Sequence, residues 1–344
     1  MLLPALLLAP ALLLTVSTVG PPTPGTLCTP SDARLAELSA LGVRAGTVLA
    51  TGDGDVTEVL ALDPASCAVT GTLDVGLDLR DVEDLAVAAD GTVWLADTGD
   101  NRRTRDTVAL VSVGEAGVPS GLHRLSYPDG PHDAEALLLQ RDGRPVVVTK
   151  AVSGTAGVYA PDVPVDRLAE PGPTPMARVG QVRIAATDTP GGPVGSLGSV
   201  LVTGGAVSTD GTVAALRTYT DAYLWSVPDG DVVDALASDP VRVPLAGEPQ
   251  GEAVAFTADG ALLSGSEGPA GVLPAIRTVV GATGLAVVAP AQTPGATTPP
   301  ASDQPAPASD GSGLERWQAA VIAVVVAGAV VWLVGRLRRA GRRR

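Results

Sequence analysis

The chain is 344 residues long, with 45% hydrophobic, 3% aromatic and 17% charged residues and a formal net charge of −14. Residues 1–314 hold 16 of the 23 basic residues and 36 of the 37 acidic ones, a net charge of −20. Such an acidic surface argues against a nucleic-acid partner, because phosphate binding needs clustered Lys and Arg, and it favours the attraction of cations.

Residues 1–24 predict a secretory signal peptide. The run from Met1 to Val19 is mostly Leu and Ala, is short for a membrane span, and is followed by a Pro- and Thr-rich stretch. Neither a basic residue before the run nor a clean cleavage site after it is present, so retention as an anchor is the alternative. Residues 25–44 then form an N-terminal segment in which Ser31–Leu41 predicts a short helix, with Ser31 as its N-cap.

Cys28 and Cys67 are the only cysteines. In an exported protein an isolated pair favours one disulfide, here between the segment before the domain and the end of its first group of strands. The alternative, two free thiols or zinc ligands, is less favoured because the spacing matches no zinc pattern.

Residues 45–288 contain a degenerate repeat. Four stretches, 83–97, 135–150, 206–219 and 252–267, each consist of an apolar strand, an Asp-Gly turn and a second apolar strand, with the Asp-Gly pairs 52, 68 and 49 residues apart. A weaker fifth unit covers 47–50 and 57–63. Asp-Gly between apolar runs indicates a hairpin, and this spacing approaches the period of a propeller blade. The fold class is therefore all-β, a β-propeller of five to seven blades with six favoured; a pair of β-sandwiches is the alternative.

Polar residues recur at equivalent ends of these strand pairs, and a propeller would bring them together at one mouth of a central channel. The set is Glu83, Asp84, Asp97, Asp133, Glu135, Lys150, Arg217, Gln250, Glu252 and Glu267. Clustered carboxylates must be neutralised, and their oxygens suit Ca²⁺ or Mg²⁺, so the acids among them are candidate metal ligands. The alternative is that they cap strand ends and bond backbone amides.

Two loops add candidate ligand-binding groups. The segment 97–105 carries Arg102, Arg103 and Arg105, which could present guanidinium forks to a phosphate or carboxylate, together with Lys150, Arg217 and Tyr219. The alternative is a solvated turn with local Asp–Arg pairs. His132 follows in the next unit and is the best general-base candidate, so His132, Lys150 and Arg217 are the weak catalytic candidates.

The C-terminal part predicts a membrane tether. Residues 289–315 are rich in Pro, Ala, Ser and Thr and predict an extended stalk. A span follows at 316–335, where the charge-free run 317–335 covers roughly 28 Å as a helix. The tail 336–344 holds six arginines, which should remain cytoplasmic and leave the rest of the chain outside.

The motifs DVEDLA (81–86), LADTGDNR (95–102), YPDGPHDAEAL (127–137), VTK (148–150), RTY (217–219), PQGEAV (249–254) and SEG (266–268) occur in this order. Over about residues 44–288 the chain resembles exported β-propeller proteins of high-GC Gram-positive bacteria and is distantly similar to phytase-like esterase propellers. The latter similarity implies calcium and a phosphate ester, with metal binding at Glu83, Asp84, Glu135, Glu252 and Glu267. The chain departs from the usual acid-glycine pair in the first two of these units.

Three functions follow as hypotheses. The first is a cell-surface ectodomain that binds an extracellular or cell-wall ligand, such as a small anion, at an acidic channel mouth with Ca²⁺. The second is a calcium-dependent phosphoesterase or lactonase-like hydrolase. The third is a structural envelope protein.

Overall fold

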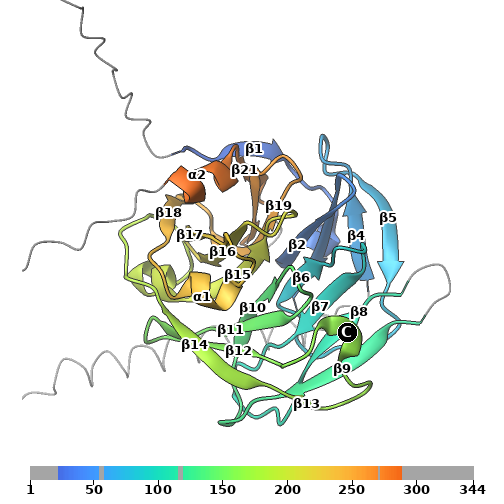
Figure 1. Ribbon diagram of the computed structural model, residues 1–344. Helices are drawn as coiled ribbons and strands as arrows, with labels where there is room; N and C mark the ends of the chain where they lie inside the picture. Colours follow the sequence, from blue (N-terminus) through green and yellow to red (C-terminus); the bar gives the residue numbers. More distant parts are fainter. Residues whose placement is uncertain (1–21, 54–57, 115–118, 270–271, 289–344) are drawn as a thin grey trace, which may run out of the picture. The chain divides into compact units, whose positions relative to one another are not determined.

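The computed structural model describes residues 22–53, 58–114, 119–269 and 272–288, which form five sheets around an axis (Figure 1). The innermost strand of each sheet contacts the innermost strands of the two neighbouring sheets, so the sheets close into a ring. The predicted all-β propeller is therefore confirmed, with five blades rather than the favoured six.

Each blade is a sheet of four antiparallel strands in its core, numbered here from the axis outwards. Blade 1 is β2 (Leu38–Arg44), β3 (Thr47–Gly52), β4 (Glu58–Leu62) and β5 (Val69–Asp74). Blade 2 is β6 (Asp84–Val87), β7 (Val93–Asp97), β8 (Val108–Ser112) and β9 (Gly121–Ser126), with the parallel edge strand β13 (Thr174–Pro175). Blade 3 is β10 (Ala134–Leu139), β11 (Pro145–Thr149), β12 (Thr155–Ala160) and β14 (Ala177–Arg183). Blade 4 is β15 (Val202–Val207), β16 (Val213–Thr218), β17 (Asp221–Ser226) and β18 (Val241–Pro244). Blade 5 is β19 (Gln250–Phe256), β20 (Leu262–Glu267), β21 (Ile276–Val279) and β1 (Gly25–Cys28).

Short helices lie between or after the strands. They are η1 (Ala33–Leu35), η2 (Val165–Arg167), η3 (Gly195–Val200), α1 (Val232–Leu236) and α2 (Ala282–Val288). None of the helices in the described part of the chain is long and apolar enough to cross a membrane. The predicted stalk, span and tail at 289–344 and residues 1–21 of the predicted signal peptide lie outside the described residues.

The helix predicted at Ser31–Leu41 is wrong. A single 3₁₀ turn, Ala33–Leu35, begins after Asp32, whose carboxylate accepts from the Arg34 N–H, and Leu38–Arg44 is the innermost strand of blade 1. Its residues Leu38 to Leu41 are buried against both neighbouring blades, so tertiary burial decides their conformation. The propeller therefore begins before the predicted boundary at residue 45.

The four Asp-Gly turns do join the two inner strands of blades 2 to 5, as predicted. In each turn the glycine has a positive φ and its N–H bonds the carbonyl oxygen three residues earlier, for example Gly91 to Ala88 at 2.9 Å. The aspartate keeps an ordinary negative φ and caps the turn instead, as the Thr92 N–H to Asp90 Oδ1 bond of 2.9 Å shows. Only the glycine therefore supplies the left-handed residue of these hairpins.

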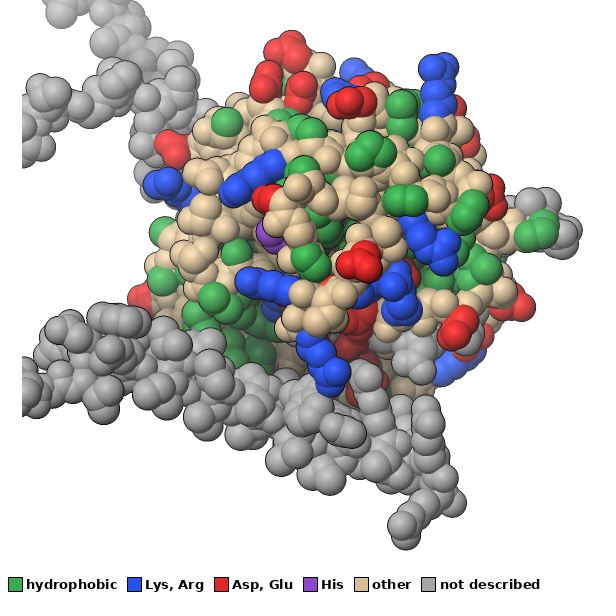
Figure 2. Space-filling view, turned by 90° about the horizontal axis from the view of Figure 1, so that it is seen from below, with side chains coloured by type: hydrophobic (Ala, Val, Ile, Leu, Met, Phe, Trp, Pro, Cys, Tyr) green, Lys and Arg blue, Asp and Glu red, His purple; other side chains and the backbone are tan. Residues whose placement is uncertain are grey.

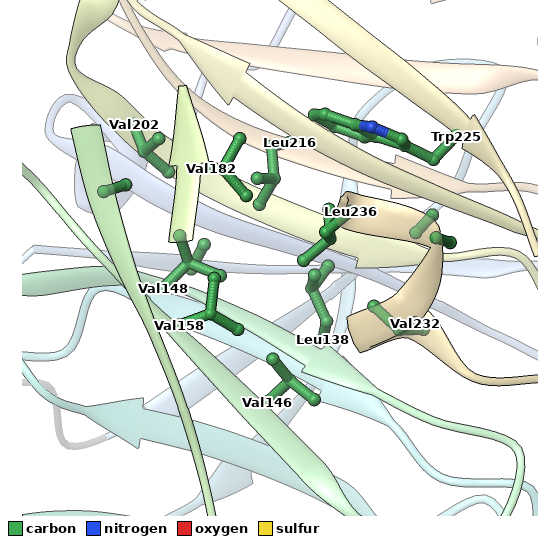
Figure 3. Close-up of a cluster of buried hydrophobic side chains, with 14 of the residues drawn as sticks. Leu138, Val146, Val148, Val158, Val182, Val202, Leu216, Trp225, Val232 and Leu236 are labelled. Atoms are coloured by element: carbon green, nitrogen blue, oxygen red, sulfur yellow. The ribbon is translucent and has the colours of Figure 1, made fainter. Parts of the chain in front are cut away.

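Five hydrophobic clusters fill the spaces between adjacent blades. The cluster between blades 3 and 4 includes Val148 and Val158 from one sheet and Leu216 and Trp225 from the next (Figure 3). Each sheet is thus buried on both faces, which explains why strands such as Val93–Asp97 are apolar without alternation.

The N-terminal strand closes the ring. β1 pairs with β21, so the last blade takes its outermost strand from the other end of the propeller. The predicted Cys28–Cys67 disulfide is confirmed, and it joins β1 of blade 5 to the β4–β5 turn of blade 1. It therefore crosses the closure of the ring rather than stapling one blade internally.

Candidate functional site

Each blade places one residue at the same end of the axis, and in four of the five blades a register shift in the innermost strand marks this residue. A register shift lies near the start of four innermost strands: at Ser39 in β2, Glu135 in β10, Thr203 in β15 and Glu252 in β19. Glu83 occupies the corresponding position directly before β6. A bulge turns the extra residue's side chain out of the regular pleat. Ser39 and Thr203 use this to reach the next blade, where they donate to the carbonyl oxygens of Glu83 (3.1 Å) and Gly251 (2.8 Å).

The other three members of this ring carry carboxyl groups, and Asp133 adds a fourth. We call Glu83, Asp133, Glu135 and Glu252 the axial acid cluster; each is at most 9% exposed. Carboxylate oxygens of Glu83, Asp133 and Glu135 lie within 4.8 Å of one another. The sequence prediction that equivalent strand ends would bring distant acids together is correct for these residues.

Lys150, at the end of β11, is the cation of the cluster. Its Nζ lies 2.5 Å from Glu135 Oε1 and 5.1 Å from the centre of the Tyr219 ring. Burial lowers the pKa of Lys150, but Glu135, Tyr219, Glu252 and Glu83 raise it, and the net shift is well above the ordinary value. Lys150 is therefore charged at neutral pH and surrounded by acids.

The carboxyl groups resist ionisation. Burial, reinforced by the charge of Glu135, raises the pKa of Glu83 well above its ordinary value, and burial does the same for Glu135 despite Lys150. Burial also raises the pKa of Glu252 to about 8. A single lysine thus leaves several buried carboxyl groups without a compensating charge, which a cation could supply.

Glu83 is the least satisfied of these acids. The residue is 8% exposed, and among the described residues no donor bonds its carboxylate. Gly99 lies directly behind it, because a Cβ there would stand 2.1 Å from Glu83 Oε1. A methyl group at residue 99 would therefore displace the Glu83 carboxylate from this position.

A second acid group shares Glu83. Carboxylate oxygens of Asp53, Asp81 and Glu83 also lie within 4.8 Å of one another. Burial, followed by the charges of Asp53 and Asp133, raises the pKa of Asp81 to about 7. Neither Asp53 nor Asp81 is among the site residues predicted from the sequence, because both lie outside the repeated strand pairs. The acid-rich string 81–84 could have indicated Asp81.

Asp84 lies on the axis rather than at the cluster. It is fully buried, and its carboxylate accepts from the N–H groups of Leu85 (2.8 Å), Leu137 (2.7 Å) and Gly205 (3.0 Å) on β6, β10 and β15. Burial raises its pKa well above the ordinary value, although the three amides oppose this. Asp84 therefore joins three innermost strands, as the strand-capping alternative foresaw.

Asp97 and Arg105 hold the 97–105 loop. Asp97 Oδ1 accepts from the Asp81 N–H at 2.9 Å and pairs with Arg105 Nη2 at 3.1 Å. Arg105 also donates to the carbonyl oxygens of Gly99 (2.6 Å) and Asp97 (2.7 Å), and its N–H bonds Asp100 Oδ2 (2.7 Å). The side chains of Arg102 and Arg103 are exposed. Of the three arginines predicted to bind an anion, Arg105 therefore bonds its own loop instead.

Arg217 is also committed internally. It is completely buried, its Nη2 pairs with Glu248 Oε2 at 2.7 Å, and its Nη1 bonds Ser264 Oγ at 2.8 Å. Sequence reasoning missed Glu248, which lies outside the repeat units. Because these donors are occupied and inaccessible, we leave Arg217 out of the proposed ligand-binding and catalytic groups.

Glu267 and His132 adjoin different members of the cluster. Gln250 donates from Nε2 to Glu252 Oε1 at 2.9 Å and also to Glu267 Oε2. His132 Nε2 lies 2.9 Å from Asp129 Oδ1 and 2.9 Å from the Tyr159 hydroxyl, which donates to Asp129 Oδ2. His132 is therefore oriented by a carboxylate, and its neighbour Asp133 belongs to the axial acid cluster.

The cluster suits a hard cation. Its donors are carboxylate oxygens, which Ca²⁺ and Mg²⁺ prefer, and no histidine or cysteine belongs to either acid group in the described part of the chain. Carboxylate oxygens of this kind suit either of these two ions.

Comparison with known proteins adds little to this picture. No protein-family model and no curated protein matches the chain. Among solved structures, it is similar to the PQQ-bound aldose sugar dehydrogenase of Streptomyces coelicolor, with a TM-score of 0.40 and 13% identity over 76% of this chain and 99% of that one. A gluconolactonase of Xanthomonas campestris matches with a TM-score of 0.39 and 14% identity over 71% of each chain. A streptogramin B lyase matches with a TM-score of 0.36 and 10% identity over 73% of this chain and 66% of that one. The fold assignment accordingly rests on the sheet order.

Proposed function

We propose that the protein binds a divalent cation, Ca²⁺ in the first place, at Glu83, Asp133 and Glu135, and through it an extracellular or cell-wall ligand. The observation that carries this proposal is Glu83, a residue that is only 8% exposed, whose carboxylate accepts no hydrogen bond among the described residues and lies close to two further carboxylates. Burying a carboxylate without a partner is costly, and a bound cation removes that cost.

Export supports calcium rather than a cytoplasmic ion, and it is part of the proposal. The signal peptide, the stalk and the arginine-flanked span predict an ectodomain outside the membrane, tethered at its C-terminal end. The Cys28–Cys67 disulfide agrees with an oxidising compartment. The net charge of −20 on residues 1–314 would attract cations to the domain.

A melting experiment tests the cation site. At a free Ca²⁺ concentration a hundredfold above Kd, binding to the folded state adds about 2.7 kcal/mol to the free energy of unfolding. The wild-type protein should melt at a higher temperature with Ca²⁺ than with a chelator, and Glu83→Gln and Glu135→Gln should lose this difference.

Glu170→Gln is the matched control, since Glu170 is exposed and outside both acid groups. It should retain the calcium-dependent increase. An equal increase in Glu83→Gln, or none in the wild type with either Ca²⁺ or Mg²⁺, would remove the basis for the site and favour a structural envelope role.

Hydrolysis is the second candidate, and one observation favours it. His132, held by Asp129 at 2.9 Å, lines the same cavity as Asp133 and Lys150, so a base stands next to the proposed cation site. A calcium-dependent phosphoesterase or lactonase would use this base to deprotonate water. Turnover of a phosphate-ester and lactone panel that disappears in His132→Gln, while the calcium-dependent melting shift persists, would establish it; no turnover by the wild type would leave a binding protein.

A further inference from the structure

We propose that the cavity on blade 3 beside the axial acid cluster binds a small hydroxylated carboxylate, of the chemical class of acidic sugars, through Arg103 and Arg178. This inference deepens the proposed function by naming the ligand. It rests on the cation site only for the coupling described below, because the cavity's own side chains carry the anion binding.

The cavity has a volume of about 300 Å³, room for a monosaccharide-sized ligand. Its wall comes from the end of β11, the 151–153 turn, β12 and β14, and from the 97–105 loop. Asp133 of the axial acid cluster and Lys150, which pairs with Glu135, both line it. The cavity and the cation site therefore share a wall.

Two guanidinium groups stand at this cavity without a carboxylate partner. Within the described residues, neither Arg103 nor Arg178 makes a side-chain hydrogen bond or an ion pair. Arg103 is placed by the loop that Arg105 holds, and it has a φ of 52° with its N–H bonded to the Asp100 carbonyl oxygen at 2.7 Å. A planar guanidinium matches a planar carboxylate with two parallel bonds.

Basic residues are scarce in this acidic domain, so their placement is informative. Figure 2 views the edge of the propeller nearest β9, β13 and β14 and shows several Lys and Arg side chains across the middle of that face. Arg178 belongs to β14 on this edge. Arg103 and Arg178 are exposed, whereas the four residues of the axial acid cluster are buried.

The charges around the cavity favour a singly charged ligand. Lys150 is paired with Glu135 at 2.5 Å, which leaves Arg103 and Arg178 against Asp133. The remaining charge of about one positive unit matches one carboxylate and falls short of a phosphate monoester, which carries nearly two negative charges.

Hydroxyl-bearing side chains in the cavity wall could hydrogen-bond the hydroxyl groups of the ligand. Thr149, Ser153, Thr155 and Tyr159 line the cavity, and of the described residues around it only Ala151 and Val152 have aliphatic side chains. Tyr159 turns over Gly157, where a Cβ would stand 2.7 Å from the ring, so its position depends on that glycine. A wall of hydroxyls and guanidiniums suits a sugar acid better than an apolar ester.

The shared wall predicts that cation and anion reinforce each other. A divalent cation bound by Asp133 would neutralise the one carboxylate that faces the cavity, so the anion would bind more tightly. By linkage the anion must then tighten cation binding by the same factor. We expect the calcium-bound protein to bind the anion about fivefold or more tightly than the calcium-free protein, the lower end of typical couplings.

Calorimetric titration of the whole protein with glucuronate tests the proposal, with glucose as the uncharged probe and glucose 6-phosphate as the doubly charged one. In chelator, glucuronate should bind, glucose should not, and Arg178→Gln should weaken glucuronate binding at least tenfold. Arg167→Gln is the matched control, because Arg167 is an exposed arginine of η2 outside the cavity, and it should bind as the wild type does.

Each other outcome has a definite meaning. Absence of glucuronate binding, or equal binding by Arg178→Gln, overturns the anion site, and tighter binding of glucose 6-phosphate in chelator overturns its assignment to a carboxylate. Glu83→Gln should keep calcium-free glucuronate binding and lose its enhancement by calcium. A protein that binds glucuronate but not calcium would therefore refute the proposed cation site while leaving the anion site intact.

Discussion

Replacing Glu252 by glutamine should stabilise the cation-free protein, increasingly so as the pH rises. Glu252 is 9% exposed, and burial raises its pKa from 4.5 to about 8, although Lys150 opposes the shift. In the unfolded chain the group titrates at its ordinary value. Below its ordinary pKa, Glu252 is protonated in both states and does not affect the free energy of unfolding. Above that pKa the folded protein retains a proton that the unfolded chain releases, so the free energy of unfolding falls until the pH exceeds the pKa of Glu252 in the folded protein.

The magnitude follows from that difference. At pH 7, about 2.5 units above the unfolded value, a cost of about 1.4 kcal/mol per unit lowers the free energy of unfolding by about 3 kcal/mol. A glutamine avoids this cost and still offers an oxygen to Gln250 Nε2, now 2.9 Å from Glu252 Oε1. For a domain of this size the gain corresponds to a melting temperature about 6–12 °C higher.

The assay is denaturant unfolding of wild type and Glu252→Gln in chelator at pH 4.5 and at pH 7. The variant should be more stable at pH 7 and nearly equal to wild type at pH 4.5, and Glu170→Gln should match the wild type at both. A gain of equal size at both pH values would show that protonation of Glu252 is not its cause, and a loss at pH 7 would refute the reasoning outright.

Three further predictions concern the framework of the site. Gly99→Ala places a methyl group 2.1 Å from the present position of Glu83 Oε1, so it should weaken Ca²⁺ binding at least tenfold in a titration. The circular dichroism of the β-sheets should persist, and an unchanged Ca²⁺ affinity would show that the cation binds elsewhere. Cys28→Ser removes a crosslink spanning 39 residues and should lower the free energy of unfolding by about 4 kcal/mol. Reduction of the wild-type disulfide should have the same effect, and a loss of less than about 1 kcal/mol would contradict the prediction. Arg217→Met removes the nearer of the two arginines that pair with buried Glu248, leaves Arg277 at 3.6 Å, and should lower the free energy of unfolding by about 3 kcal/mol. The double variant Arg217→Met/Glu248→Gln should recover part of this loss, and strictly additive losses would contradict the pairing.

The repeat made most of the fold predictable. The Asp-Gly hairpins and their apolar strands marked the inner halves of blades 2 to 5, because glycine's positive φ is a local requirement that the sequence records directly. Blade 1 was misread because its inner hairpin turns at Ala45-Gly46 and its innermost strand has a helical spacing of apolar residues. The weak fifth unit, at 47–50 and 57–63, is the second and third strand of that blade.

The site was predictable only as far as strand equivalence reached. Glu83, Glu135 and Glu252 start equivalent strands, so the repeat placed them together. Their neighbours depend on partners that the repeat does not contain: Asp84 finds amides on other blades, and Arg217 finds Glu248 in a connecting loop. Residue type alone could not separate these internal roles from an exposed site.

The central claim is that a cation lies among Glu83, Asp133 and Glu135. Anomalous diffraction from crystals grown with Ca²⁺ tests it most directly. We expect a peak with oxygens of these three carboxylates at about 2.3–2.6 Å, and its loss in Glu83→Gln. No peak between these carboxylates at saturating Ca²⁺, or a peak that Glu83→Gln leaves unchanged, would contradict the account.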